Sequence, residues 1–162
     1  MKRRILVLLV DNNPGVLTRI TLLFAQRGFN IKSLTVSPTQ SPATSRITIV
    51  TQADKDLITQ VIKQTSKLVE VQSVELLDEK ESVEKDLLLL KISTARGFDE
   101  RRFCDISNLH GAQIIDLSKS SLIVQLSASP QVIDEYLGRL EGFVILEQAR
   151  TGISAMARQG GV

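Results

Sequence analysis

Residues 5–28 read ILVLLVDNNPGVLTRITLLFAQRG and show how the fold begins. The first six residues form a short, continuous apolar run that ends in polar residues, which is typical of a strand buried on both faces. Asn13 is then expected to cap a helix with Pro14 at its first position, and apolar residues recur at helical spacing from Val16 to the stop at Gly28. The stretch therefore predicts a buried strand, a tight turn and an amphipathic helix.

The residues that follow complete one architectural unit. Asn30–Ser37 and Ser45–Thr51 are rich in β-branched residues and predict two strands. Asp54 can cap a second helix, and Val69–Leu77 predicts a closing strand. The order β-α-β-β-α-β is that of a ferredoxin-like unit, in which an antiparallel sheet carries both helices on one face.

The same order of elements returns in the second half of the chain, after a mostly charged stretch. Leu87–Ile92 predicts a buried strand, one helix is expected to stop at Gly111, and another to start at Ser129-Pro130. We therefore expect an α+β chain of two ferredoxin-like β-α-β-β-α-β units in tandem. The predicted parts are a first unit (1–77), a charged linker (78–86), a second unit (87–151) and a loosely held, glycine-containing tail (152–162).

Composition narrows the range of partners. The 162 residues carry 20 Lys and Arg against 18 Asp and Glu, a net charge of +2 that does not favour a nucleic-acid partner. Aromatic residues make up only 4% and Trp is absent, which also disfavours base-stacking surfaces. No apolar run approaches the ~20 residues of a membrane span. The single cysteine fits a reducing compartment, so we expect a cytoplasmic protein with neither nucleic-acid nor membrane partners.

Catalytic side chains are scarce. With one histidine, His110, a protomer cannot assemble a Ser-His-Asp, Cys-His or His-rich metal constellation. His110 precedes Gly111 at a predicted helix end, where it is expected to satisfy terminal carbonyls, and Cys104 is expected to pack in a core. No cofactor or metal site is predicted on this chain.

The turn Asp11–Leu17 is the one stretch that suggests a binding site. A helix N-terminus offers unsatisfied N–H donors and a positive dipole end, and Gly15 leaves room for a ligand carboxylate. Asn30, which opens the second predicted strand, would add an amide. A purely structural alternative stays open, in which Asn13 caps the helix, Gly15 fits the turn and Asn30 pairs with loop backbone.

Several segments, in order along nearly the whole chain, resemble the regulatory (small) subunit of acetolactate synthase. The longest is FAQRGFNIKSLTVSPT at residues 24–39, and the others are SRITI (45–49), KLVEV (67–71), GAQIID (111–116), VQL (124–126) and ARTG (149–152). The resemblance implies an amino-acid-sensing ACT domain in the first half and an ACT-like second domain. It also implies a non-catalytic chain that activates a separate catalytic large subunit and confers feedback inhibition in branched-chain amino acid biosynthesis.

In that family the effector, valine, leucine or isoleucine, lies between the ACT domains of two protomers, so the resemblance implies a homodimer. The matching positions for its carboxylate and ammonium groups are Asn12, Gly15, Val16 and Asn30, with Leu17 and Ile31 nearby. Thiamine diphosphate, Mg²⁺ and FAD are expected on the catalytic partner and none on this chain. Two alternatives remain: a free-standing ACT protein that regulates another enzyme or a transcription factor, and a small enzyme that uses carboxylates.

Overall fold

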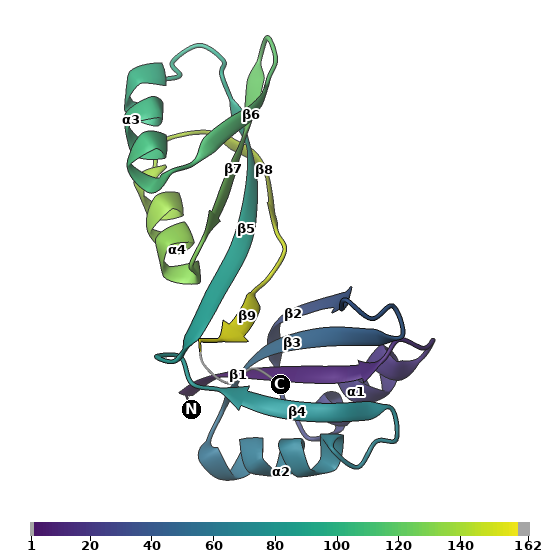
Figure 1. Cartoon of the computed structure of the whole chain (residues 1–162). Helices are drawn as coiled ribbons and strands as arrows, with labels where there is room; N and C mark the ends of the chain where they lie inside the picture. The colour runs from purple at the N-terminus through teal and green to yellow at the C-terminus, as the bar shows by residue number, and fades with distance from the viewer. Residues whose placement is uncertain (1, 159–162) are drawn as a thin grey trace. The chain divides into compact units, whose positions relative to one another are not determined.

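The computed structural model describes residues 2–158, which form two compact units (Figure 1). The N-terminal unit contains residues 2–83 together with 153–158, and the C-terminal unit is Glu84–Gly152. Each unit repeats the order β-α-β-β-α-β, which confirms the predicted fold class.

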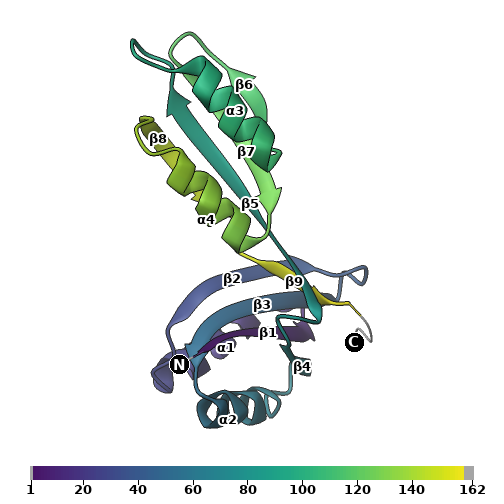
Figure 2. The same cartoon turned by 90° about the vertical axis from the view of Figure 1, so that its left-hand side faces the viewer.

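The N-terminal unit is a four-stranded antiparallel sheet in the order β2-β3-β1-β4, with both helices on one face (Figures 1 and 2). Its core lies between the sheet and the helices and includes Leu6, Leu8 and Val10 of β1 together with Val16, Ile20 and Phe24 of the first helix. The elements are β1 (Lys2–Asp11), α1 (Val16–Gln26), β2 (Ile31–Pro38), β3 (Thr44–Ala53), α2 (Lys55–Thr65) and β4 (Val71–Leu77).

The C-terminal unit has the same plan, with its strands in the order β6-β7-β5-β8. Leu88, Leu90 and Ile92 of the central strand are fully buried against the two helices. Gly111 ends the first helix in a left-handed conformation (φ 72°), and Ser129 with Pro130 begins the second, both as expected. The elements are β5 (Ser82–Ser93), α3 (Glu100–His110), β6 (Gln113–Leu117), β7 (Ser121–Ala128), α4 (Pro130–Arg139) and β8 (Ile145–Arg150).

The start of α1 differs from the prediction. The residue before the helix is Gly15, whose φ of 86° lies in the left-handed region, and no side chain caps the helix. Pro14 therefore lies in the turn and not in the helix, and Asn13 contributes only its backbone carbonyl, which accepts from the Val16 N–H at 3.4 Å. The prediction of an Asn13 cap is wrong because the chain reverses one residue later, at the only residue of the turn that adopts this conformation without strain.

Parts of the segments expected to be a charged linker and a loose tail form strands. A tight turn at Asp78–Glu81, closed by a 3.2 Å backbone hydrogen bond, leads directly into β5 at Ser82. After β8, the chain forms a short strand, β9 (Ser154–Ala157), in the N-terminal unit. The tail is held because Ile153 and Ala155 pack on the helix-free face of the first sheet, against Ile5, Val7, Val50 and Leu77. The rest of the predicted tail, 159–162, lies outside the described residues.

Candidate functional site

The turn between β1 and α1 is fixed by the loop that joins β2 to β3. The Asn12 side chain donates to the Pro42 carbonyl at 2.9 Å, and the Asn12 backbone N–H donates to the Ala43 carbonyl at 2.8 Å. Asp11, the last residue of β1, accepts a 2.8 Å hydrogen bond from the Gln72 side chain. The turn is therefore tied by hydrogen bonds to one end of the sheet, although its residues 12–15 are exposed.

The first turn of α1 has no side-chain cap. Because no side chain caps this helix, the N–H groups at its start remain available to an anionic group. Val16 is buried beneath the sheet, so it can offer only its backbone to a ligand, whereas Leu17 is 40% exposed beside the turn. The structure thus has Asn12, Gly15, Val16 and Leu17 together at one turn, with the Val16 side chain packed in the core.

Asn30 and Ile31 lie elsewhere. Ile31 pairs with Thr51, which pairs with Arg4 near the start of β1, while the turn follows Asp11 at the other end of the same strand. Arg4 and Asp11 are seven residues apart along β1, a distance of about 23 Å at ~3.3 Å per residue. The expectation that Asn30 lies beside the turn is therefore wrong within one protomer, because β2 runs parallel to β1 and its start lies at the opposite end of the sheet.

The Asn30 side chain is exposed and makes no hydrogen bond within the described residues, while its backbone carbonyl accepts one from the buried Thr51 hydroxyl at 2.8 Å. Its backbone is thus fixed by the sheet, and its amide is presented to solvent at the edge strand β2.

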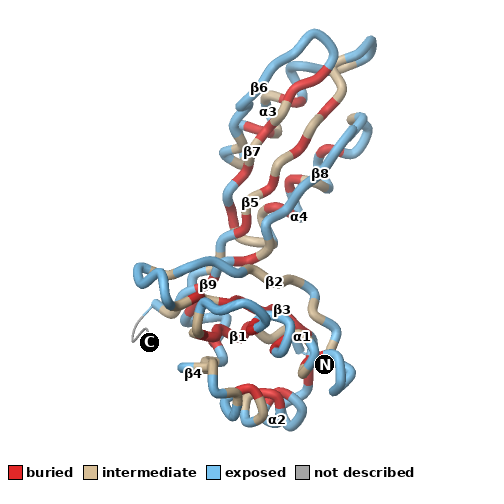
Figure 3. The backbone as a smooth tube through the Cα atoms, turned by 90° about the vertical axis from the view of Figure 1, so that its right-hand side faces the viewer, coloured by how far each residue is buried: buried red, intermediate tan, exposed pale blue. Residues whose placement is uncertain are grey.

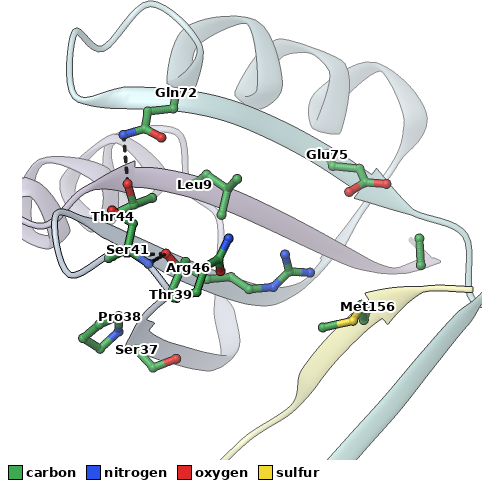
Figure 4. Close-up of a pocket in the computed structure, with 12 residues that line it drawn as sticks. Leu9, Ser37, Pro38, Thr39, Ser41, Thr44, Arg46, Gln72, Glu75 and Met156 are labelled. Atoms are coloured by element: carbon green, nitrogen blue, oxygen red, sulfur yellow. Dashed lines mark hydrogen bonds between the residues drawn. The ribbon is translucent and has the colours of Figure 1, made fainter. Parts of the chain in front are cut away.

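The helix-free face of the same sheet carries a hollow of about 480 Å³ that sequence reasoning missed (Figure 4). It lies at the turn end of the sheet and is lined mainly by the β2–β3 loop, by Leu9, Arg46 and Glu75 of the sheet, and by Met156 of β9. Arg46 extends across it and donates to the Ala155 carbonyl at 2.8 Å, so one of its functions is to hold β9 on the sheet. The signal in the sequence was an arginine within an otherwise β-branched strand.

Other polar groups have structural partners. The His110 Nδ1 lies 2.9 Å from the Ile106 carbonyl at the end of α3, which bears out the prediction for this residue. Burial raises the pKa of Tyr136, whose hydroxyl lies 3.0 Å from that of Ser107 between α3 and α4. Among residues 2–158, no group of three or more His, Cys, Asp or Glu side chains is arranged to hold a metal ion. None of the helices in that range is long and apolar enough to cross a membrane.

The repeated β-α-β-β-α-β plan and the glycine turn at the start of the first helix define a protein with two tandem ACT-like units. Family profiles agree: residues 6–73 match the AHAS small subunit-like ACT domain, and residues 85–159 match the small subunit of acetolactate synthase. The chain belongs to the acetolactate synthase small-subunit family.

Its relatives match over nearly their full length. It is 39% identical to the acetolactate synthase isozyme 3 small subunit of Salmonella typhimurium, covering 96% of each chain. It is also 39% identical to a probable acetolactate synthase small subunit of Archaeoglobus fulgidus, covering 98% of each. The crystal structure of the acetolactate synthase small subunit from Thermotoga maritima, 33% identical, superimposes with a TM-score of 0.91 over 99% of both chains.

Proposed function

We propose that this chain is a non-catalytic, cytoplasmic regulatory subunit that senses a branched-chain amino acid and controls an acetolactate synthase catalytic subunit. The catalytic partner would carry the thiamine diphosphate, Mg²⁺ and FAD needed for the reaction. Membership of the small-subunit family supports the partnership, and the absence of a Ser-His-Asp or Cys-His set in a chain with one histidine fits a regulatory role.

The effector would be bound between two protomers. The observation that carries this is the separation of Asn30 from the turn by the length of the sheet, together with the position of β2 at a sheet edge. If the β2 strands of two protomers pair antiparallel about a two-fold axis, the start of one β2 lies beside the end of the other. Asn30 of the partner subunit then reaches the end of the sheet that carries the turn.

The other free edge does not achieve this. In the order β2-β3-β1-β4, pairing through β4 would leave both β2 strands on the outer edges of the joined sheet, far from the partner's turn. A β2–β2 dimer would also cover an edge strand whose unpaired backbone groups are otherwise open to other chains. The proposed site and the proposed dimer thus depend on the same edge.

The residue types suit a zwitterionic amino acid. The uncapped start of α1 would receive the carboxylate, and the carbonyl oxygen of the Asn30 amide would accept from the ammonium group. Leu17 and Ile31 would contact an aliphatic side chain. Hydrogen bonds to charged ligand groups contribute about 1.5–3 kcal/mol each, so a half-site with only some of them would bind weakly.

Asn30→Ala tests the proposal. Acetolactate formation from pyruvate is measured with the catalytic subunit alone, with the wild-type chain and with the variant, each with and without valine, leucine or isoleucine. We expect the variant still to activate and the effector to bind about ten- to a hundredfold more weakly, the equivalent of one or two lost ligand hydrogen bonds.

Asn108→Ala, the same change on an exposed position of α3, is the matched control and should keep normal inhibition. Inhibition of the Asn30→Ala enzyme at wild-type effector concentrations would place the effector elsewhere. Acetolactate production by this chain alone would refute its non-catalytic role.

A further inference from the structure

The central strands of the two units are apolar on both faces. In β1, the residues Ile5 and Val7 point away from the helices, and in β5 the residues Leu87 and Leu89 do the same. A sheet with one face in water normally alternates apolar and polar residues, so this pattern indicates that both faces are covered.

In the N-terminal unit the helix-free face has its cover. Ile153 and Ala155 of the β9 segment pack on Ile5 and Val7, and all four side chains are no more than 6% exposed. The corresponding face of the C-terminal unit has no such strand among the described residues of that unit. Leu87, Leu89 and Ile123 are only half-buried there. Along β5, buried and intermediate residues alternate (Figure 3).

This uncovered face contains a shallow hollow of about 170 Å³ with a pair of opposite charges at its margin. Lys91 of β5 and Glu147 of β8 are partners in the strand register, and they line the hollow together with Leu89, Ile123 and Ala149. The ion pairs found among the described residues include neither Lys91 nor Glu147. The face therefore presents an apolar centre beside one positive and one negative group that are both available.

We propose that the helix-free face of the C-terminal unit is an interface with a second copy of this chain. A patch that carries one cation and one anion side by side is self-complementary: rotation by a two-fold axis places Lys91 over the partner's Glu147, and Glu147 over the partner's Lys91. The apolar residues Leu89 and Ile123, beside the two ion pairs, would fill the hollow. This surface is distinct from the β2 edge, and the proposal does not depend on effector binding.

Thiol labelling of the full-length chain tests the interface directly. In a Cys104→Ser background, Ala149→Cys places a thiol on the hollow, on a side chain that is exposed in one copy. We expect slow labelling in the parent, and labelling about tenfold faster or more when Lys91→Glu or Glu147→Lys sets like charges against each other across the interface.

Mixing the two charge variants separates contacts between copies from contacts within one. In a mixed dimer, Glu at 91 of one chain faces Lys at 147 of the other, and the remaining Glu147 faces the remaining Lys91, while each chain keeps its own like-charged neighbours. We expect slow labelling to return in the refolded mixture. The double variant Lys91→Glu/Glu147→Lys, which restores opposite charges everywhere, controls for folding and should also label slowly.

Three results would overturn the proposal. These are fast labelling of the parent at all protein concentrations, charge variants that label as slowly as the parent, and a mixture that stays as reactive as its components. Protection that appears only when the catalytic subunit is added would likewise reject a second copy and assign the face to that subunit.

Discussion

Gly15 sets the geometry of the turn through its backbone. Its φ of 86° belongs to the left-handed region, and a Cβ placed there would meet no atom within 4 Å. A side chain at this position is therefore strained by its own backbone and not by its neighbours. Asn and Asp tolerate this conformation better than other residues, at about 1 kcal/mol or somewhat more.

Comparison of Gly15→Asp with Gly15→Asn separates charge from strain. The two side chains have nearly the same size and the same tolerance of the left-handed region, so both variants should fold and melt at similar temperatures. The carboxylate of Asp would repel the effector carboxylate at the start of α1, so we expect valine binding at least about tenfold weaker than in the Asn variant. Calorimetric titration measures the difference; equal affinities would mean that the ligand carboxylate binds elsewhere.

The buried carboxylate of Asp86 is a second position where a single residue is expected to affect stability. Arg150 donates to Asp86 at 2.8 Å and to Asp134 at 2.8 Å, but the Asp86 side chain is 3% exposed and that of Asp134 is 66% exposed. Burial opposes the charge on Arg150, and its hydrogen bonds to Asp134 and Asp86 outweigh this, so the pKa of Arg150 is raised above its ordinary value.

The two partners of Arg150 should differ in their contribution to stability. Asp86→Ala leaves a half-buried guanidinium without its inner partner and is expected to lower the free energy of unfolding by about 2–4 kcal/mol. Asp134→Ala removes an exposed partner and should lower it by less than about 1 kcal/mol. Urea denaturation followed by circular dichroism measures both values. Equal losses of unfolding free energy would show that the exposure of the carboxylate does not decide how much each ion pair of Arg150 contributes.

Among the secondary-structure elements, those with strong local signals were predicted well. The end of α3 follows from Gly111 and the start of α4 from Ser129-Pro130, because caps and helix stops act over a few residues. β9 was missed for the opposite reason. Its residues have no strand pattern of their own. The strand forms because its backbone pairs with β5, and because distant residues of β1, β3 and β4 provide an apolar surface for Ile153 and Ala155.

A pair of substitutions in and beside β9 tests how firmly it is held. Ile153→Ala removes a side chain that is 6% exposed, and the cavity left on the helix-free face should lower the free energy of unfolding by about 2–4 kcal/mol. Met156→Ala, in the same segment, alters a side chain that is 62% exposed and should change it by less than about 0.5 kcal/mol. Chemical denaturation of both variants provides the comparison. A loose tail, as the sequence suggested, would give two equally small effects.

In the complete molecule, the candidate site could be predicted as a set of residues but not as a place. Asn12, Gly15 and Leu17 are close in sequence and therefore close in space. The position of Asn30 depends on strand order. β3 lies between β2 and β1 and is antiparallel to both, so β2 runs parallel to β1 and begins at the end of the sheet opposite the turn. Strand order is a long-range property that spacing along the chain does not contain. If Asn30 and the turn act together as proposed, a site divided between the ends of one sheet requires a second protomer to become complete.

Complementation between two defective chains tests this requirement. A Gly15→Asp chain lacks a usable turn but keeps Asn30, and an Asn30→Ala chain has the reverse defect. In a heterodimer of the two, one site combines the intact turn with the intact Asn30, and the other site carries both defects. We therefore expect each homodimer to bind valine poorly, and the heterodimer, isolated with two different affinity tags, to bind about one valine per two chains with wild-type affinity. Equilibrium dialysis gives the stoichiometry and light scattering confirms the dimer. Defects that persist in the heterodimer would show that turn and Asn30 do not act across the dimer, whereas a wild-type monomer that binds valine as tightly as the dimer would exclude a shared site altogether.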